Sequence, residues 1–395
     1  MSQRFWYLAG VGTFIVPMGM QTILFPWLVV VQLHEGAERL GLAQMCTQLP
    51  AIFLILFGGV LADRMDARKI LLLGHLLAAL PMLGLALALS LDGLSYSILI
   101  VYALLMGVVT AFVQPARDGL LNRVAGGEVQ QTVMFTMGLT FLAQLLGYFL
   151  ASQADNAGPV MILLVQAVIV LAGMLTIWKL VPGVVLAALP GQSTRQQLFA
   201  GLRLVLDSDR MLPALIILLA VAFFFGGSFS VLNPLIVRDI YQGGANEISM
   251  TFAAFGSGTI TMLVLLIVRG GIARQGRAML LSMLTGGLTL GVGAFHLPFM
   301  GYLAALFFWG MSGGVAMSMG RTIMQEAAPE NARSRVMSVF SLATLGGMPF
   351  GALLMGYCAG AFGPLASLLI SVAGVWVTSA GILWHGRLWG LTTQQ

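Results

Sequence analysis

The seven residues DRMDARK, at positions 63–69, lie between two long apolar stretches and decide how this sequence folds. Five of the seven carry charge, whereas only 8% of the whole chain is charged. The stretch before them has no formal charge from Leu40 to Ala62. Dense charge between two membrane-length apolar segments is typical of a short cytosolic turn between transmembrane helices. The sequence therefore predicts an integral membrane protein.

The composition supports this class, because 59% of the residues are hydrophobic, against about half in a soluble globular chain. A spanning helix needs roughly 20 mainly apolar residues, since lipid cannot satisfy open backbone groups. Such segments are predicted at 6–32, 40–62, 69–91, 95–116, 130–153, 158–181, 211–237, 247–268, 278–296, 298–320, 335–360 and 364–386. The expected fold is all-α, with about twelve transmembrane helices.

The basic residues indicate how the chain is oriented. With these spans, all but two of the 19 Lys and Arg residues fall on one side of the membrane, and the two exceptions are Arg39 and Arg238. This positive-inside pattern predicts that both termini are cytoplasmic. The net charge of +5 is then explained by topology and by contact with anionic lipid headgroups, and no nucleic-acid partner is expected.

The sequence predicts no metal site and no catalytic constellation. The two cysteines, Cys46 and Cys358, each fall inside a predicted span, and the four histidines are scattered. No Walker A sequence is present, so the chain is not an ATP-driven pump.

The longest polar interruption divides six predicted spans from six others. We expect an N-terminal bundle at 1–181, a cytoplasmic linker with a short amphipathic helix at 182–209, and a C-terminal bundle at 210–395. Landmarks repeat at an offset of about two hundred residues, such as the proline near the end of the first and seventh spans, Pro26 and Pro234. The repetition predicts two pseudo-symmetric six-helix halves.

The segment GGVLADRMDARK, residues 58–69, resembles the signature loop between helices 2 and 3 of the major facilitator superfamily, G-x-x-x-D-[RK]-x-G-R-[RK]. The matching positions are Gly59, Asp63, Arg64 and Arg68. Asp66 replaces the Gly of the pattern and Ala67 replaces its first Arg. The alternative to this resemblance is an ordinary topogenic turn.

The resemblance implies that this loop acts as a conformational latch that favours the outward-open state. Gly59 would let two helices approach closely, and Asp63 would complement the dipole of a facing helix N-terminus. Arg64 and Arg68 would hold neighbouring carboxylates. Arg117, at the exit of the fourth span, is placed to pair with Asp63 or Asp118, or to serve as a lipid anchor.

Two further segments, FVQPARDGLLNRVAGGE at 112–128 and MGRTIMQEAAPENARSRVMS at 319–338, are similar to the drug- and siderophore-exporting branch of the superfamily, which includes enterobactin exporters. The branch implies a monomer in a bacterial inner membrane that uses a proton gradient and no cofactor to export a small molecule. The Gly-Pro motif of exporters is reduced to Gly147 in the fifth span, whereas the second half keeps GGMPFG at 346–351.

In the superfamily, spans 1, 4, 7 and 10 line the central path. The polar and aromatic residues expected there form the candidate substrate cavity: Gln21, Phe25, Gln114, Phe225, Phe229, Asn233 and Trp309. Aromatic side chains, with nearby methionines, would give an adaptable apolar surface suited to amphipathic substrates.

All 14 Asp and Glu residues lie in loops or near the ends of spans. Intramembrane carboxylates usually mark proton sites, so their absence from the bilayer midplane is informative. If protons are coupled, the candidates are Glu35, Asp239 or the Asp63–Arg117 cluster.

Three alternatives to export remain open at this point. An importer or facilitator of a small neutral solute is favoured by two features. The bilayer midplane has no carboxylate, and the fifth span lacks most of the exporters' Gly-Pro motif. A membrane-embedded enzyme would need clustered His, Asp or Arg at one face, and none is visible. A non-transporting sensor would depend on loop residues rather than on cavity residues.

Overall fold

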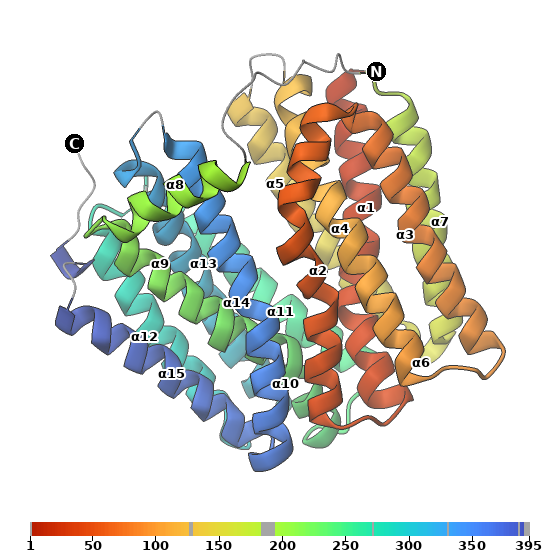
Figure 1. Ribbon diagram of the computed structural model, residues 1–395. Helices are drawn as coiled ribbons and strands as arrows, with labels where there is room; N and C mark the ends of the chain where they lie inside the picture. Colours follow the sequence, from red (N-terminus) through yellow and green to blue (C-terminus); the bar gives the residue numbers. More distant parts are fainter. Residues whose placement is uncertain are drawn as a thin grey trace. The chain divides into compact units, whose positions relative to one another are not determined.

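The computed structural model describes residues 2–125, 129–182, 194–270, 272–329, 332–385 and 388–390. Figure 1 shows this part of the chain as a series of helices joined by short connections. No strand occurs among these residues, so the predicted all-α class is confirmed.

The first half of the chain contains α1 and the π-helical turn η1 that ends it, followed by α2 to α7 (Figure 1). Their bounds are Gln3–Trp27 (α1), Leu28–Gln32 (η1), Ala37–Arg64 (α2), Ala67–Ser90 (α3), Tyr96–Val124 (α4), Val129–Ala151 (α5), Ala154–Ala157 (α6) and Pro159–Trp178 (α7). The charged stretch that opened the sequence analysis thus contains the break between α2 and α3, as expected of a turn between two spans.

The rest of the chain begins with α8, which lies in the predicted linker region. The remaining elements are Thr194–Leu206 (α8), Met211–Ala220 (α9), Val221–Gly226 (η2, π-helical), Gly227–Asp239 (α10), Ala245–Val268 (α11), Gln275–Gly293 (α12), Phe299–Ala327 (α13), Arg333–Phe362 (α14), Pro364–His385 (α15) and the 3₁₀ turn Leu388–Gly390 (η4). The predicted seventh span is therefore one helical path made of α9, η2 and α10.

The chain forms two compact units. Unit 1 comprises Met1–Glu35, Cys46–Gly191 and Gly243–Ser249, and unit 2 comprises Gly36–Met45, Gln192–Gln242 and Met250–Gln395. The division into halves at 1–181 and 210–395 stays a prediction.

Within the described residues, ten helical segments are long and apolar enough to cross a membrane. They are Gln3–Gln32, Ala67–Ser90, Tyr96–Leu121, Phe135–Ala157, Pro159–Trp178, Met211–Asp239, Ala245–Val268, Phe299–Ala327, Arg335–Phe362 and Pro364–Trp384. Each overlaps a predicted span. The spans predicted at 40–62 and 278–296 coincide with α2 and α12, and the count of twelve crossings stays a prediction.

Polar side chains at the helix starts explain where three spans begin. The Ser2 hydroxyl accepts a hydrogen bond from the Phe5 N–H at 3.3 Å, and Ser95 accepts one from Ile98 at 3.4 Å. The Asp66 carboxylate accepts one from the Arg68 N–H at 3.1 Å. These caps satisfy N–H groups that the first helical turn leaves open. Asp66, one of the two residues that depart from the signature pattern, is thus the cap of α3.

Two matching turns support the predicted duplication. Gly158 precedes Pro159 at the start of α7, and Gly363 precedes Pro364 at the start of α15. Both glycines have φ of 82°, a conformation that side chains disfavour. Proline at the first helical position has a φ that already suits a helix. A glycine with positive φ followed by proline therefore starts both helices, about two hundred residues apart.

Glycines allow the backbones of α1 and α5 to touch in unit 1. A methyl group on Gly19 would lie 2.7 Å from the Gln144 carbonyl oxygen. A methyl group on Gly147 would overlap the Val16 carbonyl oxygen and lie 2.8 Å from the Met20 nitrogen. Small residues of this kind are common where membrane helices cross closely. Gly147, the glycine that the fifth-span motif retains, thus sits at the crossing.

Candidate functional site

The predicted latch is only partly described. Gly59, Asp63 and Arg64 lie in the last turns of α2, and their side chains fall outside the described residues. Arg68, Arg117 and Asp118 are described, and all three lie in unit 1. The latch role of the six residues stays a prediction.

Arg68 holds the C-terminal end of α7. Its Nη2 donates a hydrogen bond to the Trp178 carbonyl oxygen at 2.7 Å, and its guanidinium lies 5.0 Å from the centre of the Trp178 ring. Among the described residues, the partners found for Arg68 are thus a carbonyl and a ring, and its expected contact with a neighbouring carboxylate stays a prediction. A cation at a helix C-terminus interacts favourably with the helix dipole, so Arg68 ties the start of α3 to the end of α7.

The same arrangement occurs in unit 2. The Arg277 Nε donates to the Trp389 carbonyl oxygen at 3.2 Å, and the guanidinium lies 5.3 Å from the centre of the Trp389 ring. Arg277 lies in the first turn of α12, as Arg68 does in α3. Each unit thus contains an arginine that contacts the carbonyl and the ring of one tryptophan. We name these contacts the Arg–Trp pairs.

Two more side chains, Gln3 and Arg123, form hydrogen bonds to the backbone just after the end of α7. Gln3 donates to the Lys179 carbonyl at 3.4 Å and accepts from the Val181 N–H at 2.8 Å. Arg123 donates to the Val181 carbonyl at 2.8 Å and lies 3.8 Å from the Asp66 carboxylate. Since Asp66 is 9% exposed, this ion pair is better shielded from water than a surface pair. The substitution at the signature's Gly position therefore adds a charge contact between α3 and α4.

We expect the Arg68→Ala variant to be less stable than the wild type. The change removes a charged hydrogen bond and a cation–π contact, together worth about 1–3 kcal/mol. Unfolding of the purified protein in detergent would measure the loss. Lys69→Ala, a change of an exposed cation in the same turn, is the matched control. Equal stability of the Arg68 and Lys69 variants would contradict a holding role for the Arg–Trp pair.

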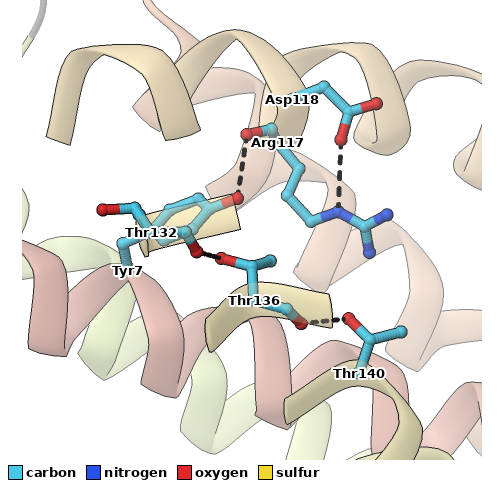
Figure 2. A network of polar contacts seen from close by, with 6 residues as sticks. All are labelled: Tyr7, Arg117, Asp118, Thr132, Thr136 and Thr140. Atoms are coloured by element: carbon cyan, nitrogen blue, oxygen red, sulfur yellow. Dashed lines mark hydrogen bonds and ion pairs between the residues drawn. The ribbon is translucent and has the colours of Figure 1, made fainter. Parts of the chain in front are cut away.

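Figure 2 shows a polar network where α1, α4 and α5 meet. The buried Tyr7 of α1 donates from its hydroxyl to the Arg117 carbonyl oxygen in α4 at 3.3 Å. The Arg117 Nε lies 3.9 Å from the Asp118 carboxylate. The pairing of Arg117 with Asp118 was one of the two expected. Because the Asp118 side chain is 65% exposed, this pair contributes little to stability.

Three threonines of α5 form a column beside Tyr7 (Figure 2). The Thr136 hydroxyl donates to the Thr132 carbonyl at 2.8 Å, and the Thr140 hydroxyl donates to the Thr136 carbonyl at 2.7 Å. The Thr132 hydroxyl is buried without a partner among the described residues. The column gives the apolar bundle a polar strip next to the predicted latch.

The predicted path residues of unit 1 include one polar–aromatic group. The Tyr102 hydroxyl of α4 donates to Gln21 Oε1 in α1 at 2.6 Å. The ring of Phe25, one turn further along α1, stacks on the Tyr102 ring with centroids 6.1 Å apart. Gln114 is half-buried in α4. Gln21 and Phe25 are therefore brought together by Tyr102, a residue that was not predicted.

Three predicted path residues of unit 2 meet in one aromatic cluster. Phe229 of α10 lies 5.5 Å from Trp309 of α13, and Phe225 of η2 lies 5.5 Å from the same Trp309, measured between ring centroids. Phe252 and Phe255 of α11 lie 4.3 Å and 4.4 Å from Phe229. We call these five residues the aromatic cluster. Phe229 and Trp309 each contact three of the other four rings, and together they hold the cluster.

Asn233 has its hydrogen bonds satisfied within unit 2. Its amide nitrogen donates to the Thr251 hydroxyl at 2.7 Å, and its amide oxygen accepts from the Tyr302 hydroxyl at 3.1 Å. The side chain is 2% exposed. These bonds join α10, α11 and α13 one turn from Phe229, so Asn233 supports the helices that carry the aromatic cluster. A direct contact of Asn233 with substrate stays a prediction.

The two acidic candidates for proton coupling lie at helix ends. Glu35 is half-buried just after η1. Asp239 is exposed at the last residue of α10 and forms two contacts with the neighbouring Arg238, at 2.5 Å and 3.1 Å. The role of both residues in proton coupling stays a prediction.

Sequence reasoning missed Phe252 and Phe255, because the eighth span is outside the four spans that the superfamily places on the path. Their spacing of three residues on a helix puts both on one face, and this signal was available in the sequence. Among the described residues, no group of three His, Cys, Asp or Glu side chains could hold a metal ion.

The sequence was also compared with protein families and with known proteins. The family model of the Major Facilitator Superfamily matches residues 9–352. A staphyloferrin A transporter of Staphylococcus aureus is 24% identical over 374 residues, which cover 90% of this chain and 88% of the relative. The enterobactin exporter EntS of Shigella boydii is 27% identical over 385 residues, which cover 93% and 88%.

Solved structures share the fold. The nucleoside transporter NupG aligns with a TM-score of 0.75 at 14% identity and covers 97% of this chain and 99% of that one. A D-xylose–proton symporter aligns with a TM-score of 0.71 at 14% identity, covering 99% of both. The matching family model, the helices and the signature loop lead to one conclusion: this chain is a transporter that belongs to the Major Facilitator Superfamily.

Proposed function

We propose that this chain exports a small amphipathic molecule of the drug or siderophore class in exchange for protons. The observation that carries the proposal is the aromatic cluster of unit 2, which gathers three residues predicted for the substrate path. Two relatives named for siderophores, the staphyloferrin A transporter and the enterobactin exporter, support the substrate class.

The chemistry of the aromatic cluster suits a substrate with flat apolar parts. Aromatic pairs prefer edge-to-face or offset contacts at 4.5–7 Å, worth about 0.5–1.5 kcal/mol each. Phe225 and Trp309 already meet edge to face, at an interplanar angle of 86°. A substrate ring would meet the same preferences on the half-buried Phe229.

The proposed mechanism is alternating access by a monomer in a bacterial inner membrane. Two pseudo-symmetric halves rock around a site near the bilayer midplane, and both chain termini are cytoplasmic. The driving force is the proton gradient, with no cofactor. The loop residues Gly59, Asp63, Arg64 and Arg68, with Arg117 and Asp118, act as the latch. The basic residues contact anionic headgroups of the inner leaflet.

Accumulation in whole cells tests this proposal. Cells that express the chain, and cells that carry an empty vector, are loaded with ethidium, norfloxacin or enterobactin, each with and without a protonophore. We expect lower accumulation of at least one compound in the expressing cells and loss of the difference with the protonophore. Higher accumulation in the expressing cells would indicate an importer. A difference that survives the protonophore would contradict proton coupling.

A further inference from the structure

His75 is an ionisable side chain in the third turn of α3, a helix long and apolar enough to cross a membrane. It lies on the buried face of the helix and is 1% exposed. Ionisable groups at membrane depth are costly, and they usually mark ion or proton pathways. The acidic candidates Glu35 and Asp239 lie at helix ends, whereas His75 lies two turns inside its helix.

The two nitrogens of the ring are in different situations. Nδ1 lies 2.7 Å from the Leu71 carbonyl oxygen, which can only accept, so Nδ1 carries a hydrogen. Nε2 is buried and has no hydrogen-bond partner among the described residues. In the neutral ring, Nε2 therefore presents a lone pair that no donor meets. A proton on Nε2 would turn this nitrogen into a donor.

The groups around Nε2 suit a donor better than an acceptor. A methyl group on Gly173 of α7 would lie 2.9 Å from His75 Nε2 and 2.5 Å from the Thr13 hydroxyl of α1, so the two side chains border the same point. The Thr13 hydroxyl already donates to the Gly10 carbonyl at 3.0 Å, which leaves its lone pairs free to accept. The Gly10 backbone also faces the ring.

No fixed charge competes with a proton at this position. From α1 the ring meets Gly10, Thr13 and the edge of Phe14, whose centroid is 5.3 Å away. From α7 it meets Gly173, and α4 packs on the neighbouring Gly74 through Val113. None of these groups is ionisable, and no charged side chain among the described residues faces the ring.

We propose that His75 is the proton-binding site of the transport cycle, and this rests on the proposed proton-coupled export. A proton from water on one side of the membrane forms the Nε2–H bond, and the ring becomes a cation. In the other conformational state the bond breaks, and the proton returns to water on the opposite side. Thr13, whose hydroxyl borders the ring, is the group that would accept a hydrogen bond from the protonated Nε2.

The second unit supports a special role for this histidine. With Arg68 and Arg277 of the Arg–Trp pairs as the reference, the position of α12 that corresponds to His75 is Leu284. Leu284 is exposed and its neighbour Met283 is buried, and both are apolar, so α12 has no ionisable residue where α3 has His75. His75 is therefore a residue of α3 that the predicted repeat does not reproduce in α12.

Direct observation of the ring tests proton binding without any substrate. Wild-type protein labelled with ¹⁵N-histidine is reconstituted in bilayers, and its imidazole nitrogens are followed by solid-state NMR from about pH 8 to about pH 4. The His75 signals are assigned by their absence from the His75→Gln variant. We expect a neutral ring protonated at Nδ1 that converts to the doubly protonated form. A ring that stays neutral wherever the protein remains folded would overturn the proposal.

Transport by reconstituted protein tests coupling. The probe is whichever of ethidium, norfloxacin and enterobactin wild-type cells export. Stimulation by a pH gradient is compared with counterflow, the exchange of labelled for unlabelled probe without a gradient. We expect the stimulation of transport by a pH gradient to be lower by at least about tenfold in His75→Gln than in the wild type, while counterflow is unchanged. Full gradient stimulation in His75→Gln would overturn the role of His75 and leave proton-coupled export standing. A wild type that shows no gradient stimulation would refute the proposed function first.

Gln166 provides a matched control on α7. It is 0% exposed, and both of its amide atoms lack partners among the described residues, but it does not ionise. We expect Gln166→Leu to keep gradient stimulation. If this variant loses the stimulation to the same extent, buried polarity rather than a proton on His75 is responsible, and the assignment is overturned.

Discussion

The Gly351→Leu variant should yield almost no folded protein. Gly351 lies on α14, in the GGMPFG segment at 346–351, and a methyl group there would overlap the carbonyl oxygen of Phe223 in η2. Gly347, one turn earlier, approaches the same element, since a methyl group there would lie 2.9 Å from the Phe223 nitrogen. Backbone, unlike a flexible side chain, cannot move aside without separating the helices. Overpacking a tight core costs about 1–3 kcal/mol, and clashes with backbone cost more.

Size-exclusion chromatography of detergent-solubilised protein measures the amount of folded chain. Gly346→Leu is the matched control, because Gly346 is on the same helix and a methyl group there meets nothing within 4 Å. We expect the Gly346 variant to elute like the wild type. A monodisperse Gly351→Leu protein in normal yield would show that α14 and η2 do not need this contact.

The Phe229→Ala variant should fold but export poorly. Phe229 contacts three rings of the aromatic cluster, at centroid distances of 4.3 Å, 4.4 Å and 5.5 Å. Its loss removes the surface on which we place the substrate ring. With aromatic contacts worth about 0.5–1.5 kcal/mol each, we expect export to fall by about tenfold or more. Efflux of preloaded probe from energised cells, corrected for the amount of protein in the membrane, measures the change.

Phe308→Ala is the control for this prediction. Phe308 precedes Trp309 on α13, but its side chain is 54% exposed, and its ring contacts Phe307 rather than the aromatic cluster. We expect export to be unchanged in this variant. If Phe229→Ala and Phe308→Ala export equally well, the aromatic cluster is core packing and not a binding surface.

Apolar segment length was enough to predict the helices. The charged turn at 63–69 gave the break between α2 and α3 correctly, because a dense run of charge cannot remain in lipid. Apolar segment length placed the spans predicted at 158–181 and 364–386, where Gly-Pro turns start α7 and α15. These are local properties of the chain, so a single sequence contains them.

The partners of the functional side chains depended on packing that the sequence does not display. The sequence did not indicate that Arg68 would contact the Trp178 carbonyl and ring at the end of α7. It also did not indicate that the Asn233 amide would bond to Thr251 and Tyr302, and the place of Asn233 on the substrate path stays a prediction. Which helix faces which decides both outcomes. The side chains of Gly59, Asp63 and Arg64 lie outside the described residues, and their latch role stays a prediction.

His75 shows a different reason for a missed residue. A lone histidine inside an apolar helix has no motif, and scattered histidines excluded only a metal site. It was singled out by Nε2, which has no hydrogen-bond partner in the described part of the chain, and by Thr13 and Gly173 beside it, on helices far apart in the sequence. Three-dimensional contacts were needed to identify it.

The central claim is that outward movement of an amphipathic substrate is exchanged for protons. The most direct test is proton flux in proteoliposomes that contain the wild-type protein and a trapped pH-sensitive dye. Enterobactin, ethidium or norfloxacin is added outside, and both the probe and the internal pH are followed. We predict that entry of probe acidifies the outside and raises the internal pH, and that an imposed pH gradient drives the probe toward the acidic side. Probe movement at the same rate with and without a gradient, and without proton flux, would contradict the account.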